Sequence, residues 1–220
     1  MAALPQRPVV RDALVGAAGR RIAGLEEIGP DILERQVVAH WQTALQQHPR
    51  PGRVGYDCDL LAAVDPAALV DHLSGAFDGQ VGGTWRESAA RARAHHSYQV
   101  FEVYPWATTL LHGLPPGPAV SVLDRCRIRS GVVSEIDGEW VVVKSSLLTW
   151  DGDSLTPSLP QVEGARWSVN GQSLLPPPAV GDTVALHWDW VCDVLTPDQA
   201  KRRELMEATQ RTAVGLGGTA

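Results

Sequence analysis

Two residues far apart in the chain have side chains that could share a metal ion. Cys126 stands between Arg125 and Arg127, with Arg129 close behind, and His187 follows much later. The three arginines predict a thiol pKa below the usual value of ~8.5, which favours the thiolate. A thiolate and an imidazole together suit a late first-row metal, with iron among the candidates. The chain has no Cys-x-x-Cys pair, so the sequence does not predict a structural zinc site with four ligands.

His187 belongs to a segment, residues 183–193, in which apolar and polar side chains alternate. A period of two with β-branched and aromatic residues predicts a half-buried strand. Its apolar face carries Val184, Leu186, Trp188, Trp190 and Cys192. His187 and Asp189 would share the opposite face, where a ligand or partner can reach them. There Asp189 could hold the imidazole in one orientation by a hydrogen bond, or it could be a solvated strand residue.

The candidate ligands also have plainer interpretations. Free cysteine is among the most buried residue types, so Cys126 could be a small core side chain. His187 could be a hydrogen-bonded histidine at the rim of the fold. His95 and His96 form a second candidate pair, but adjacent side chains point in different directions, so one site rarely uses both. A capping role near a helix C-terminus fits this pair better, because a protonated imidazole interacts favourably with the helix dipole there.

The first half of the chain is mainly helical by its apolar spacing. Helical periodicity is weak over residues 10–28 and clearer after Pro30. Asp65 and Pro66 form a helix start, because aspartate can cap a helix and proline fits its first turn. A further helix is expected over residues 85–94, and an extended aromatic segment follows it.

A change of pattern divides the chain. We expect a helical domain over residues 1–112 that ends in the extended aromatic segment. The Pro/Gly run at residues 113–119 predicts a linker. Short strands follow, which predict a small OB-like β-barrel with a C-terminal helix over residues 120–212. Residues 213–220 are expected to form a flexible tail. The predicted fold class is therefore α+β.

Local signals mark the elements of the barrel region. Residues 120–136 read as one long strand or two, and Asp137-Gly138 predicts a hairpin turn after them. Thr196, with Gln199 three residues later, has the pattern of a capping box at the start of the closing helix.

Composition excludes several classes of function. The formal net charge is −6 with no basic stripe, which argues against a nucleic-acid-binding protein. No apolar run approaches the roughly 20 residues that a membrane-spanning helix needs. The three cysteines are an odd number and lie far apart, so they do not predict a disulfide framework. The N-terminal segment lacks the apolar core of a signal peptide, and we expect a cytoplasmic protein.

From Cys126 to the end of the closing helix, the chain resembles the small chaperones of NiFe-hydrogenase maturation, of the HypC/HupF type. In that family a cysteine is followed by a glycine, then by strands, a Val-Gly-Asp segment, a histidine and a capped helix. Here Cys126 and Gly131 match the cysteine and the glycine, residues 180–182 match Val-Gly-Asp, His187 matches the histidine, and residues 196–207 match the helix.

The sequence also departs from that family. The cysteine is internal here, whereas the family has it directly after the initiator methionine. Ser130 stands where the family has proline, and Trp188 follows the histidine in place of a small residue. The whole chain resembles an uncharacterised group from GC-rich bacteria with the motifs HHS (95–97), VYPW (103–106) and HWDWVCD (187–193).

The resemblance to the chaperones implies a function. It implies that Cys126 and His187 hold iron, as an ion or as the unit that carries carbon monoxide and cyanide. The implied partners are a cofactor-assembly protein and the large subunit of a NiFe-hydrogenase. A chaperone of this kind is a binding protein and not a turnover enzyme.

Two other functions remain open at this point. The chain could be a metal-free interaction module built on an OB-like barrel. It could also be a Cys–His hydrolase or transferase, with Cys126 as nucleophile, His187 as base and Asp189 orienting the base. No nucleophile elbow or oxyanion-hole loop is evident in the sequence, so we rank the enzyme last.

Overall fold

The computed structural model describes residues 65–77, 82–86, 89–93, 95–171, 173 and 175–218. The helical segments expected over residues 10–28 and after Pro30 lie outside the described residues, as does Cys58. The described part combines helices with a closed β-barrel, so the α+β fold class is confirmed. No described helix has the length and the apolar character that a membrane span requires.

The first described helix, α4, begins where the sequence predicts it. It spans Pro66–Ala76, and the Asp65 carboxylate accepts a hydrogen bond from the Ala67 N–H at 3.1 Å. Leu69 and Leu73 are buried on one face. The helix expected over residues 85–94 is wrong in its described part, which holds only the short 3₁₀ helix η1 (Ala89–Arg91).

The next segment is helical where an extended chain was expected. It consists of α5 (His96–Tyr98), the π-helix η2 (Gln99–Val103) and α6 (Trp106–Leu111). All five residues of η2 are buried. The aromatic side chains that suggested a strand are therefore core residues of a helical layer. A π-turn is rare and often lies beside a functional site.

Helix α7 (Pro116–Cys126) replaces most of the predicted linker and the first part of the predicted strand. Proline is tolerated in the first turn of a helix, so the Pro/Gly run starts this helix. Ala119, Leu123 and Cys126 are buried at the i, i+4 and i+7 positions. The division into two domains remains a prediction. One hydrophobic cluster joins Val100 from η2 to residues as distant as Leu216.

Five strands close into a barrel in the order β1-β2-β5-β7-β6. The strands are β1 (Arg129–Asp137), β2 (Trp140–Ser145), β5 (Gln161–Arg166), β6 (Thr183–His187) and β7 (Trp190–Val194). Neighbours are antiparallel except for the parallel pair β5–β7. A small closed barrel of this kind is OB-like. The hairpin expected at Asp137-Gly138 joins β1 to β2.

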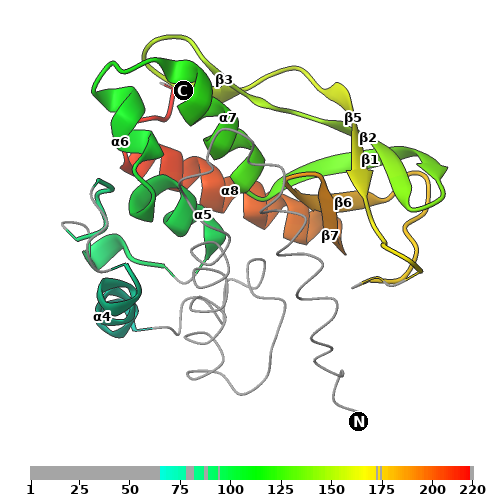
Figure 1. The fold of residues 1–220 in the computed structure, drawn as a ribbon, viewed down its shortest axis with the longest axis horizontal. Coiled ribbons are helices and arrows are strands. Elements are labelled where there is room, and N and C mark those ends of the chain that lie inside the picture. Colours follow the sequence, from blue (N-terminus) through cyan, green and yellow to red (C-terminus); the bar gives the residue numbers. More distant parts are fainter. Residues whose placement is uncertain are drawn as a thin grey trace.

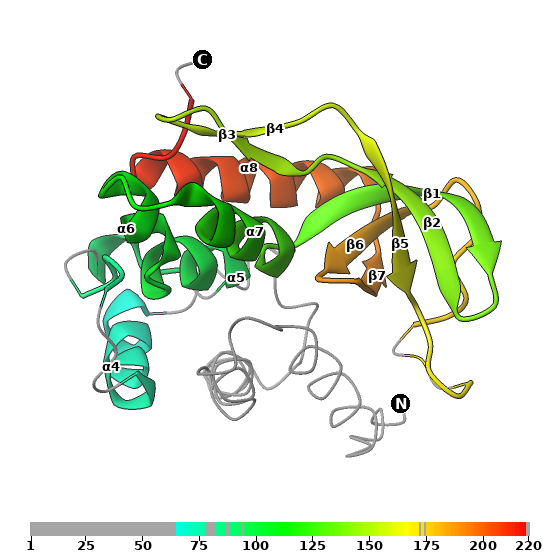
Figure 2. The ribbon, with the colours of Figure 1, turned by 45° about the horizontal axis from the view of Figure 1, so that its top comes forward.

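Two further strands, β3 (Leu148–Trp150) and β4 (Leu155–Pro157), form a separate two-stranded sheet. This sheet lies over the side of the helices that faces away from α4 (Figures 1 and 2). It contributes Leu148 and Leu155 to the hydrophobic cluster of the helical layer.

The prediction of a single strand over residues 183–193 is wrong, because this segment forms a hairpin of two strands. Strand β6 ends at His187, and β7 begins at Trp190. Trp188 turns the chain with a φ of 56°, in the left-handed region that a bulky residue seldom adopts. Its side chain leaves the barrel and is buried in the hydrophobic cluster of the helical layer. His187 and Asp189 are thus not neighbours on one strand face.

Helix α8 (Pro197–Ala213) has the predicted capping box, with Thr196 and Gln199 bonded to each other's backbone N–H. It starts at the barrel and runs along the helical layer (Figure 1). The buried face of α8 carries Glu207 and other polar side chains. The chain stays packed beyond residue 212, where the sequence predicts a tail, because Leu216 is fully buried and its carbonyl accepts the Leu155 N–H at 2.9 Å.

Candidate metal centre

Cys126 is the last residue of α7 and has a relative exposure of only 1%. Its thiol is not activated in the way that the sequence predicts. Burial raises the pKa of Cys126 to about 12, and a contact with the Trp188 indole lowers it only in part. The arginines do not offset burial, because Arg127 and Arg129 are bonded to carboxylates. The prediction of a lowered thiol pKa is therefore wrong.

His187 lies beside Cys126, with its Nε2 atom 3.8 Å from the cysteine Sγ. The end of β6 carries His187 to this place. The Trp188 N–H then donates to the Arg125 carbonyl at 2.8 Å, which ties the hairpin turn to the last turn of α7. The structure thus brings together the two residues that the sequence selected as ligands.

A third side chain completes the cluster, and sequence reasoning missed it. The His96 Nε2 lies 3.7 Å from the Cys126 Sγ and 2.6 Å from the Cys126 carbonyl oxygen. The rings of His96 and His187 meet edge to face, with centroids 4.9 Å apart. One ligand atom from each of the three residues lies within 4.8 Å of the others.

The two adjacent histidines divide their roles. The His95 Nδ1 accepts the Tyr98 N–H at 3.1 Å and so caps α5 at its N-terminus, not at a C-terminus as predicted. His96 points to Cys126. The expectation that one site would not use both histidines agrees with this geometry. The sequence did contain a usable signal: if only one histidine of the pair caps a helix, the other is available as a metal ligand.

Asp189 lies in the hairpin turn, two residues after His187. Its main-chain carbonyl accepts the Arg166 N–H at 2.6 Å, which joins the turn to β5. That the Asp189 carboxylate orients the His187 ring remains a prediction.

Both histidines of the cluster favour the neutral form. Burial lowers the pKa of His96, and hydrogen bonds to the Cys126 backbone and to Gln99 oppose this in part. Burial also holds the pKa of His187 well below its usual value, and the nearby His96 and Arg129 lower it further. A neutral imidazole keeps a lone pair for a metal ion, so these histidines can bind one without first losing a charge.

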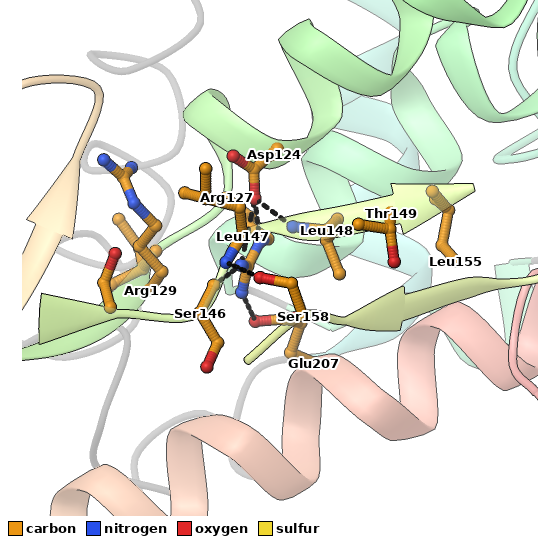
Figure 3. A network of polar contacts seen from close by, with 12 residues as sticks. Asp124, Arg127, Arg129, Ser146, Leu147, Leu148, Thr149, Leu155, Ser158 and Glu207 are labelled. Atoms are coloured by element: carbon orange, nitrogen blue, oxygen red, sulfur yellow. Dashed lines mark hydrogen bonds and ion pairs between the residues drawn. The ribbon is translucent and has the colours of Figure 1, made fainter. Parts of the chain in front are cut away.

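A second buried cluster, made of ion pairs, is centred on Arg127, the residue after Cys126. The Arg127 guanidinium donates to Asp124 Oδ1 at 3.0 Å, to Glu207 Oε2 at 2.9 Å and to the Ser146 carbonyl at 2.6 Å. Figure 3 shows Arg127 between these groups. Arg203 donates to the same Glu207 oxygen at 2.8 Å. These bonds join α7, α8 and the segment after β2, so the cluster holds the end of α7, where Cys126 lies.

Comparison with known proteins places the chain in a family without assigning a function. A family model described as "Family of unknown function (DUF6390)" matches residues 55–215, and the chain belongs to that family. No curated protein and no solved structure matches the chain.

Proposed function

We propose that this chain, a member of a family of unknown function, is a metal-binding accessory protein that holds iron through Cys126 and His187. The observation that carries the proposal is the distance of 3.8 Å between Cys126 Sγ and His187 Nε2. Two ligand atoms at this separation can bind one ion with bonds of about 2.0 to 2.3 Å, the values known for zinc. A thiolate with an imidazole suits iron among the late first-row metals.

The resemblance to hydrogenase maturation chaperones makes the proposal more specific. The matched cysteine precedes β1, the matched histidine ends β6, and the matched helix is α8. The matched glycine, Gly131, faces the barrel core. A Cβ at this position would lie 3.1 Å from Leu186 Cδ1 and 3.3 Å from Val143 Cβ, so the close approach of these side chains favours glycine.

In this role the iron, with or without carbon monoxide and cyanide, is cargo. The chain would receive it from a cofactor-assembly protein in the cytoplasm and dock on the large subunit of a NiFe-hydrogenase. Burial of Cys126 supports a ligand better than a nucleophile. A thiol with a raised pKa is a weak nucleophile, whereas a cation can displace its proton.

The test is anaerobic iron binding by the full chain. We expect the wild type to retain iron and Cys126→Ala and His187→Ala to lose it, with unchanged far-UV circular dichroism. His112→Ala is the control, because it removes an imidazole outside the cluster, and it should retain iron. Co-purification with a hydrogenase large subunit then tests the client, and it should weaken in the two ligand variants.

The metal-free interaction module makes the opposite prediction. In that case neither the wild type nor any variant retains iron above the level of a non-binding protein. Cys126→Ala and His187→Ala then leave the binding of any partner intact.

A further inference from the structure

We infer that His96 is a third protein ligand, so that the centre is a His₂Cys site with one position open to an exchangeable ligand. The inference rests on the proposed metal site and adds a ligand that belongs to neither of the sequence motifs matched to the hydrogenase chaperones. His96 comes from the helical layer and not from the barrel, so a metal ion bound by all three residues would link these two parts of the fold.

The two sulfur–nitrogen distances fit one shared ion. Bonds of about 2.3 Å to sulfur and about 2.0 Å to nitrogen at a tetrahedral angle place the two ligand atoms about 3.5 Å apart. The two sulfur–nitrogen distances here are 3.7 Å for His96 and 3.8 Å for His187. The near-perpendicular rings, at 86°, let both imidazoles approach the sulfur without stacking on each other. Small movements of the three side chains would close the site around an ion.

The tautomer of His96 must change when a metal binds. In the described state the His96 Nε2 lies 2.6 Å from the Cys126 carbonyl, where it can donate a proton. Ligation needs that nitrogen unprotonated, with the proton on Nδ1. The Gln99 side chain lies close enough to His96 to raise its pKa, and the Gln99 amide nitrogen donates to Tyr104 Oη at 3.3 Å. The amide oxygen of Gln99 is then the group that can accept the Nδ1 proton, as a buried neighbour of a metal-bound histidine usually does.

The indole N–H of Trp188 is a buried hydrogen-bond donor close to the Cys126 sulfur. Trp188 is buried, and its indole Nε1 has no hydrogen-bond partner among the described residues. The indole lies close enough to the Cys126 thiol to lower its pKa as a weak donor would, but without the geometry of a hydrogen bond. A metal-bound thiolate accepts hydrogen bonds more strongly than a thiol, so metal binding would give this donor its acceptor.

The ligand class follows from the donor set. One thiolate and two imidazoles bind late first-row divalent cations such as Fe²⁺, Co²⁺ and Zn²⁺ in preference to Mg²⁺ or Ca²⁺, which prefer oxygen. Three protein ligands leave a fourth position, which is the arrangement of sites that exchange a ligand and not of closed structural sites.

The three ligands come from three separate elements. His96 starts α5, Cys126 ends α7 and His187 ends β6. Figure 2 shows these elements meeting where the helical layer joins the barrel. An ion bound by all three would therefore crosslink the helical layer to the barrel hairpin, and metal binding should make the chain more stable.

Cobalt(II) binding by the anaerobic full chain tests the third ligand. His96→Gln removes the imidazole, and His95→Asn is the matched control, because asparagine keeps an acceptor at the helix N-cap. We expect His96→Gln to lower cobalt affinity by at least about 10- to 100-fold, the loss typical of changes near a metal site. Its visible ligand-field spectrum should also change, while the thiolate-to-cobalt charge-transfer band persists. His95→Asn should match the wild type in both respects.

The outcomes separate this inference from the proposed function. If the wild type binds cobalt and His96→Gln has the same affinity and spectrum, His96 is not a ligand and the Cys126–His187 proposal stands. If the wild type binds neither cobalt nor iron, both fall. Should His96→Gln fail to fold by circular dichroism, His96→Asn is measured in the same way, and the same two results decide the question.

Discussion

Cys126 and Arg127 are neighbours in the chain, but their side chains enter two different buried clusters. Arg127 joins a network in which guanidinium and carboxylate groups bond one another at 2.8 to 3.0 Å. Cys126 lies 3.7 and 3.8 Å from two histidine nitrogens, close to the separation of two ligands on one metal ion. The first cluster pairs its buried charges with one another. In the second cluster, the distances between the sulfur and the two nitrogens suit a metal ion bound between them.

This difference indicates that the ion-pair network serves the fold and the Cys–His cluster serves binding. A buried charge must be paired, so the network around Arg127 holds α7, α8 and the chain after β2 in place. The Cys–His cluster is uncharged in its metal-free form, so it holds no buried charge that needs a partner. A bound metal ion would add more favourable interactions to the Cys–His cluster than any other change. The comparison therefore predicts that substitutions in the ion-pair network destabilise the protein, while substitutions in the Cys–His cluster abolish metal binding.

The largest effect should come from the network. Glu207→Gln removes the carboxylate that pairs with Arg127, Arg203 and Arg211, and it takes a counter-charge from three buried guanidinium groups. Breaking a buried pair by removing one partner costs about 3–5 kcal/mol. We expect a loss of this size in the free energy of unfolding, measured with urea.

Glu204 is the control for that change, because its side chain is 63% exposed and it pairs with Arg203 only at the surface. Glu204→Gln should shift the stability by less than about 0.5 kcal/mol. Equal losses in the two variants would mean that the network does not hold the fold.

The next effect should come from metal binding. At a free metal concentration of 100 times Kd, the wild type should gain about 2.7 kcal/mol of stability. Cys126→Ala should lose that gain, while its metal-free stability changes by only about 1 kcal/mol. Thermal unfolding with and without anaerobic Fe²⁺ measures both terms. A metal-free Cys126→Ala protein that is unfolded would contradict the comparison, because the Cys–His cluster would then be needed for the fold.

The smallest effect should come from pH. The pKa values of His96 and His187 are lowered in the folded chain, so the unfolded chain takes up more protons as the pH falls. The stability that this difference supplies is fully present above the unfolded histidine value of about 6.5 and is lost below it. Arg129 is a further charged group that lowers the pKa of His187.

Urea unfolding of the metal-free protein between pH 7.5 and 5 should show this loss. The double variant His96→Gln/His187→Gln should show a smaller slope over the same range, and His95→Asn should keep the slope of the wild type. A double variant as sensitive to pH as the wild type would assign the loss to other groups.

The sequence by itself determined the elements whose signals are local. Asp65 with Pro66 starts α4, Thr196 with Gln199 starts α8, and Asp137-Gly138 turns β1 into β2. In each case the residues that give the signal also make the hydrogen bond or adopt the backbone angle, so their neighbours in the chain are enough. The α+β class and the OB-like barrel follow from many such signals in order.

The sequence was misleading where one local pattern permits two structures. Alternation over residues 183–193 fits one strand, but the contacts of Trp188 with the helical layer favour a turn with a left-handed residue. The Pro/Gly run before Ala119 fits a linker, yet the burial of Ala119 and Leu123 makes it the first turn of α7.

Only the tertiary structure decided the make-up of the candidate site. The sequence selected Cys126 and His187 as ligands, and the fold brings them together and adds His96, which no spacing connects to either. The fold also reversed the expected effect of the arginines. Arg127 and Arg129 pair with carboxylates from distant elements, and burial then dominates the pKa of Cys126. Desolvation and long-range pairing are sums over the packed neighbours of a group, and no stretch of sequence contains those neighbours.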